Sequence, residues 1–94
     1  MSDIEPVVFV VDDDQHIRTS LPRSLRMRGF TVEAYESAQA FLDAYDETSV
    51  GCLVLDYGMP GMSGLELQDH INRKGFPLPI IFITGHGGIP ESVQ

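Results

Sequence analysis

The chain has 94 residues, enough for one domain with a modest core. Apolar residues make up 43% of it, so we expect it to fold and exclude an intrinsically disordered chain. The 14 acidic and 6 basic side chains give a net charge of −8. This balance excludes nucleic-acid binding by the chain itself, because that binding needs clustered Lys and Arg.

The first predicted elements are a strand and a helix. Val7–Val11 is a short apolar run rich in valine, which is typical of a buried strand. Asp14 is suited to cap a helix from about Gln15 to Arg28, and Gly29 is suited to end it. Pro22 falls inside this helix and removes one of its hydrogen bonds, so we expect a kink there.

Two groups of side chains divide this helix into faces. Apolar residues recur every four positions and predict a buried stripe: Ile17, Leu21 and Leu25. Four of the chain's six basic residues lie in the same helix: Arg18, Arg23, Arg26 and Arg28. We expect these arginines to form a solvated helix face, and a face that docks a partner is the alternative.

Strand and helix patterns alternate through the middle of the chain. Phe30–Tyr35 alternates apolar and polar residues and predicts a half-exposed strand. Ser37 is suited to cap a helix that extends to about Tyr45. Gly51–Leu55 is the third predicted strand, and Gly64–Lys74 the third helix. The middle of the chain therefore predicts two more strands and two more helices.

A fourth apolar run, Ile80–Ile83, continues this alternation of strands and helices as the fourth predicted strand. This order predicts an α/β fold, a doubly wound parallel sheet with helices on both faces. The single cysteine, Cys52, makes no internal disulfide, which suits a reducing cytosol. The acidic N-terminus is no signal peptide and no run is long enough to span a membrane, so we expect a cytoplasmic protein.

Aspartates follow two of the predicted strands directly. Asp12, Asp13 and Asp14 come after the first strand, and Asp56 comes after the third. Ligands of open α/β sheets bind outside the carboxyl ends of the strands, so we expect these carboxylates to converge if the strands are neighbours. Like charges this close raise one another's pKa, and a bound cation relieves the repulsion. Oxygen ligands that leave room for water favour Mg²⁺.

This combination resembles the receiver domain of bacterial two-component response regulators. The resemblance rests on the strand-end aspartates, on the D-x-x-M-P-x-x-S-G pattern of Asp56–Gly64, and on Thr84 after the fourth strand. Ile83–Gly87 is similar to the FixJ-like branch, whose members usually carry a C-terminal helix-turn-helix output domain. The resemblance spans nearly all of residues 7–94. It implies a flavodoxin-like receiver fold with the strand order 2-1-3-4.

The resemblance also implies a role for each matching residue. Asp56 matches the phosphoacceptor, which takes a phosphoryl group from a sensor histidine kinase. Asp13 matches the direct Mg²⁺ ligand, Asp12 a ligand that acts directly or through water, and the backbone carbonyl of Gly58 a further ligand. Thr84 matches the hydroxyl that bonds the phosphoryl group. Such a domain is a switch and not an enzyme, and in this branch its output domain binds DNA and regulates transcription.

One part of the family pattern is missing from the chain. Receivers carry a lysine followed by a proline at the end of a fifth strand, whereas the only lysine here, Lys74, ends the third predicted helix. We therefore expect residues 1–94 to be a truncated receiver that lacks strand 5, helix 5 and an output domain. Ile80–Ile83 would then be a bare apolar edge, and we expect a homodimer or a swapped oligomer to form through it.

Two other functions fit parts of the pattern. A phosphatase of the haloacid-dehalogenase type also uses strand-end aspartates and Mg²⁺, and Asp12–Asp14 contains its D-x-D spacing. Such enzymes, however, need a downstream lysine and an acidic pair on a longer chain. The second alternative is a pseudo-receiver that acts only through protein contacts. The complete acidic cluster and Thr84 argue against it for the parent protein, whereas it stays open for a fragment that lacks the lysine. We expect His86 to be an ordinary loop residue.

Overall fold

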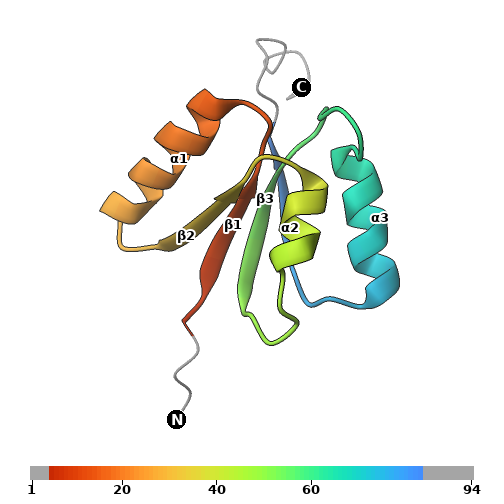
Figure 1. The fold of residues 1–94 in the computed structure, drawn as a ribbon. Helices are drawn as coiled ribbons and strands as arrows, with labels where there is room; N and C mark the ends of the chain where they lie inside the picture. Colours follow the sequence, from red (N-terminus) through yellow and green to blue (C-terminus); the bar gives the residue numbers. More distant parts are fainter. Residues whose placement is uncertain (1–4, 84–94) are drawn as a thin grey trace, which may run out of the picture.

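The structure is a computed structural model that describes residues 5–83. Its centre is one parallel sheet with the strand order β2-β1-β3-β4. The strands are β1 (Val7–Val11), β2 (Thr31–Tyr35), β3 (Gly51–Asp56) and β4 (Ile80–Ile83). The predicted parallel α/β sheet and its strand order are therefore confirmed (Figure 1).

Within residues 5–83, three helices cover the two faces of this sheet. They are α1 (Gln15–Met27), α2 (Ala38–Ala44) and α3 (Gly64–Lys74). Figure 1 shows α1 on one side of the sheet and both α2 and α3 on the other. None of these described helices has the length and apolar character needed to cross a membrane.

The predicted element boundaries differ from the observed ones by one residue in several places. Arg28 is the C-cap of α1 and Tyr45 the C-cap of α2, so both helices end earlier than predicted. Strand β2 begins at Thr31, and Phe30 before it is 52% exposed. The caps themselves are as predicted, since Asp14 and Ser37 accept backbone N–H groups at the starts of α1 and α2.

Strand β1 is buried on both faces because its side chains alternate between two clusters. Phe9 and Val11 pack with Phe41 and other residues on the face of α2 and α3. Val10 packs with Val32 on the face of α1. A strand held from both sides is a rigid support for the loop at its carboxyl end.

Helix α1 covers its face of the sheet less completely than predicted. The stripe of Ile17, Leu21 and Leu25 is only half-buried. The helix continues through Pro22, whose ring is fully buried, so apolar contact offsets the hydrogen bond that it cannot make. A kink at this residue stays a prediction.

Strand β4 lies at one edge of the sheet formed by residues 5–83, next to β3. Ile81 of this strand is 54% exposed, and Ile80, Phe82 and Ile83 are half-buried. Cys52 of β3 is also half-buried. The β3 and β4 side of the sheet is therefore less covered than its centre.

Candidate metal and phosphate site

Three carboxylates meet at the carboxyl ends of β1 and β3. Asp12 and Asp13 follow β1, and Asp56 ends β3. The two strands pair with Val11 opposite Leu55, which brings the residues that follow side by side. One carboxylate oxygen from each aspartate lies within 4.8 Å of the other two. The convergence predicted from the strand order is therefore confirmed. It lies at the carboxyl ends of the strands, which are uppermost in Figure 1.

The loop after β1 is tied down by hydrogen bonds at both ends. The Asp12 N–H donates to the Tyr35 carbonyl at 3.1 Å, which anchors the loop to β2. The Asp14 N–H donates to Asp12 Oδ1 at 2.8 Å, and the His16 N–H donates to Asp14 Oδ1 at 2.8 Å. Asp14 is thus occupied as the cap of α1, as predicted, and is not among the three converging carboxylates.

Asp12 leaves one oxygen free in this arrangement. Its side chain is fully buried, and Oδ2 has no hydrogen-bond partner among residues 5–83. A buried carboxylate oxygen without a partner is costly, and a cation is a partner that the rest of the site would also favour. The donor set consists of carboxylate oxygens from three side chains, which fits Mg²⁺ better than a softer metal. The residues present therefore fit the ion predicted from the sequence.

The electrostatics of the three carboxylates also favour a bound cation. Burial raises the pKa of the Asp56 carboxyl, the negative charge of Asp12 raises it further, and a hydrogen bond from the Gly58 N–H opposes the shift. Burial likewise raises the pKa of Asp12, with a smaller contribution from Asp13. The ionised form of both carboxyls is therefore less stable in this site than in water. Binding of a positive ion would offset that loss of stability.

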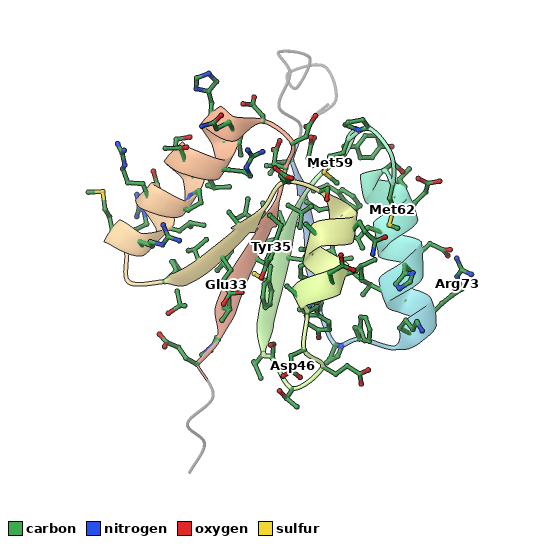
Figure 2. The ribbon with its side chains drawn as sticks, in the orientation of Figure 1. Glu33, Tyr35, Asp46, Met59, Met62 and Arg73 are labelled. Carbon is green, nitrogen blue, oxygen red and sulfur yellow. The ribbon has the colours of Figure 1, made fainter. Side chains whose placement is uncertain are left out.

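The loop between β3 and α3 is packed against the core beside this cluster. Met59 is 5% exposed and Met62 is half-buried, and both pack with the cluster of residues on the face of α2 and α3. Figure 2 shows both methionines near the first turn of α3. Gly58 donates its N–H to Asp56 Oδ1 at 3.4 Å. The loop is thus anchored by apolar contacts while its polar backbone remains beside Asp56.

Helix α3 begins very close to the end of β3. Ser63 and Glu66 form a capping box, a pattern that the S-x-x-E spacing would have predicted. At Gly64 an added Cβ would lie 2.4 Å from the backbone oxygen of Asp56. Glycine is therefore required here for close approach, which explains on steric grounds why this part of the D-x-x-M-P-x-x-S-G pattern ends with glycine.

The arginines of α1 are only partly as expected. Arg18 is half-buried and its Nη1 donates to the Asp12 carbonyl at 3.0 Å, while Arg26 Nη2 donates to the Val32 carbonyl at 2.9 Å. Arg18 therefore departs from the predicted solvated face, whereas Arg26 remains exposed although its guanidinium reaches the sheet. Arg18 lies one turn after the Asp14 cap, and that spacing is the signal that could have placed it beside the aspartates.

Two residues singled out in the sequence cannot be placed in the site. Thr84 and His86 lie outside the described residues. The last described residue of β4, Ile83, pairs with Asp56 across the sheet. The phosphoryl-contacting role implied for Thr84 stays a prediction.

Comparison with known proteins identifies the family of this chain. The response regulator receiver domain model matches residues 8–94. The chain belongs to this family. It is 43% identical over its whole length to response regulator protein TodT of Pseudomonas putida. It is also 44% identical, over 93% of its length, to transcriptional regulatory protein FixJ of Bradyrhizobium diazoefficiens. The receiver spans about two-fifths of the length of these curated relatives, 41% and 42% respectively.

Solved structures of the same family share the fold. The response regulator StyR matches with a TM-score of 0.84 and 50% identity, covering 92% of this chain and 43% of that one. FixJ-N matches with a TM-score of 0.80 and 42% identity, covering 99% and 73%. TrrA of Thermotoga maritima, solved in complex with Mg²⁺-BeF, matches with a TM-score of 0.78 and 28% identity, covering 94% and 76%. The flavodoxin-like receiver fold and the FixJ-like resemblance are confirmed.

Proposed function

We propose that this receiver accepts a phosphoryl group on Asp56 from the phosphohistidine of a sensor histidine kinase, in the cytoplasm. Asp12, Asp13, Asp56 and the Gly58 carbonyl would hold Mg²⁺. The observation that supports the proposal most is the convergence of three carboxylates, one of which, that of Asp12, has an oxygen without a hydrogen-bond partner among residues 5–83. The Mg²⁺-BeF complex of the Thermotoga maritima relative supports the choice of metal. The names of TodT and FixJ support an output that regulates transcription.

The proposed transfer requires only one covalent step from the protein. An oxygen of Asp56 attacks the phosphorus atom, an O–P bond forms, and the P–N bond to the donor histidine breaks with its electron pair remaining on the imidazole nitrogen. Bound Mg²⁺ would neutralise charge on the phosphoryl oxygens. The Gly58 N–H keeps the nucleophile directed, because it donates to Asp56 Oδ1. Thr84 is the proposed donor to a phosphoryl oxygen after transfer.

The phosphorylated state would then act as a switch. Phosphorylation replaces the single negative charge of the Asp56 carboxylate with a phosphoryl group that carries roughly −1.5 to −2 charges, beside carboxylates that already repel one another. Nearby donors must reorganise around this charge, which is how a local modification biases a loop between two arrangements. The proposed consequence is altered contact with an output that controls transcription.

Incubation of the purified protein with acetyl phosphate and MgCl₂ tests this function. We expect the mass to rise by one phosphoryl group, the modified peptide to contain Asp56, and EDTA to prevent the change. Continuous release of phosphate with labelling at Asp12 would instead indicate the phosphatase alternative. No labelling by acetyl phosphate or by a phosphorylated sensor kinase would favour the pseudo-receiver.

Self-association through β4 is a separate proposal. Exposure of 54% at Ile81, on the strand at the edge of the described sheet, supports it. We expect sedimentation velocity to show a fraction of dimer that grows with protein concentration. We expect Ile81→Lys to shift this equilibrium to the monomer. Leu65→Lys is the matched control, because Leu65 is 47% exposed but lies on α3. A wild-type monomer at high concentration would contradict the proposal.

A further inference from the structure

The guanidinium of Arg18 reaches back from the first turns of α1 to the loop that carries the acidic cluster. Its Nη1 donates to the backbone carbonyl of Asp12 at 3.0 Å, and the side chain is half-buried. Within the part of the chain that the structure describes, the one ion pair joins Arg73 to Asp69. Arg18 thus lies beside a group of carboxylates and bonds a peptide oxygen instead.

The peptide that Arg18 holds joins two proposed metal ligands. The Asp12 carboxylate is fixed by other bonds, since its Oδ1 accepts the Asp14 N–H. Asp13 is exposed, and no backbone N–H of residues 5–83 donates to its carboxylate. The plane of the peptide between Asp12 and Asp13, together with the φ angle of Asp13, sets the direction in which the Asp13 side chain leaves the backbone. The bond from Arg18 restrains that plane.

We propose that Arg18 is a positioning residue, which orients Asp13 for metal binding by holding the Asp12 carbonyl. The inference rests on the proposed function, because it takes Asp13 to be a ligand of Mg²⁺. Hydrogen bonds that orient metal ligands typically change metal affinity by 10- to 100-fold when they are removed. A single bond to the backbone between two ligands belongs at the lower end of that range.

The positive charge of Arg18 provides a way to separate positioning from simple electrostatics. A cation near the site repels Mg²⁺, so removing the charge alone would tighten binding. Removing the hydrogen bond lets the Asp12–Asp13 peptide turn and weakens binding. The two effects have opposite signs, and the sign of the measured change therefore identifies the dominant one.

Calorimetric titration of metal-free protein with MgCl₂, at fixed ionic strength, tests the proposal. We expect Arg18→Gln to bind Mg²⁺ about tenfold more weakly than the wild type. Arg18→Lys keeps a donor and a charge, and we expect it to recover part of the lost affinity. Unchanged or tighter binding by Arg18→Gln would overturn the proposal.

Arg26 offers a matched control within the same helix. It also donates to a backbone carbonyl, that of Val32, so Arg26→Gln removes the same charge and an equivalent hydrogen bond. We expect similar thermal destabilisation in the two glutamine variants but wild-type Mg²⁺ affinity only in Arg26→Gln. Equally weak Mg²⁺ binding by both variants would mean that each substitution acts only by destabilising helix α1. That result would reject a positioning role for Arg18.

Asp13→Ala distinguishes failure of this proposal from failure of the proposed site. If Asp13→Ala loses Mg²⁺ binding while Arg18→Gln keeps it, the site stands and the role of Arg18 is rejected. If Asp13→Ala binds like the wild type, the proposed metal site itself is rejected, and the role of Arg18 with it.

Discussion

Asp56→Asn is expected to abolish phosphoryl acceptance and to stabilise the metal-free protein by about 1 kcal/mol. The loss of function follows because an amide is not a nucleophile for phosphoryl transfer. The gain in stability follows because Asp56 is 8% exposed and lies beside Asp12 and Asp13. Burial and the charge of Asp12 raise its pKa, so the ionised side chain opposes folding. An amide of the same shape removes that repulsion.

The sign of the pH dependence follows from the raised pKa. A carboxyl with a higher pKa in the folded state than in the unfolded state binds its proton more tightly when folded. Its contribution to stability is complete below the ordinary value of 3.8 and is lost as the pH rises through the raised pKa of Asp56. The advantage of Asp56→Asn should therefore be small in acid and full at neutral pH.

Urea unfolding in EDTA at a series of pH values measures this effect, with mass spectrometry for phosphoryl acceptance. Asp43→Asn is the control, because Asp43 is an exposed residue of α2 outside the acidic cluster. Saturating MgCl₂ should make the wild type more stable than Asp56→Asn, because a ligand that binds only the folded state stabilises the protein that binds it. Identical stability of Asp56→Asn and the wild type at neutral pH would show that the cluster carries no unfavourable charge.

The acidic site was predictable because it depends on strand order and on little else. Runs of valine and leucine predict β1 and β3 as buried strands, and neighbouring parallel strands bring their next residues together. Asp12 and Asp56 therefore converge whatever the details of the loops. The lack of a partner for Asp12 Oδ2 among residues 5–83 was not predictable, because it depends on which of the two oxygens accepts the Asp14 N–H.

Arg18 shows where pattern alone is insufficient. An arginine on an amphipathic helix is normally solvated, and only the return of the loop after β1 supplies the carbonyl that Arg18 binds. The hydrogen bond of Arg18 leaves no trace in the apolar periodicity of the helix, and only its spacing from the Asp14 cap places it near the loop. By contrast, the 54% exposure of Ile81 agrees with the bare apolar edge expected for Ile80–Ile83.

Gly64→Ala is expected to destabilise the protein by about 3 kcal/mol and to weaken Mg²⁺ binding. Its new Cβ would lie 2.4 Å from the Asp56 oxygen and 3.2 Å from both the Phe82 ring and the Tyr57 Cα. Two of these contacts are with backbone that cannot rotate away, so the start of α3 and the end of β3 must separate. The residue displaced by that movement is Asp56, whose carboxylate belongs to the acidic cluster.

Gly75→Ala separates this steric effect from an ordinary loss of stability. Gly75 ends α3 with φ of 73°, and nothing lies within 4 Å of an added Cβ there. Alanine at this position costs about 1 kcal/mol through backbone conformation alone, far from the aspartates. Urea unfolding should therefore detect a loss in both variants, whereas calorimetry should detect weaker Mg²⁺ binding only in Gly64→Ala. Wild-type affinity in Gly64→Ala would show that α3 can shift without moving Asp56.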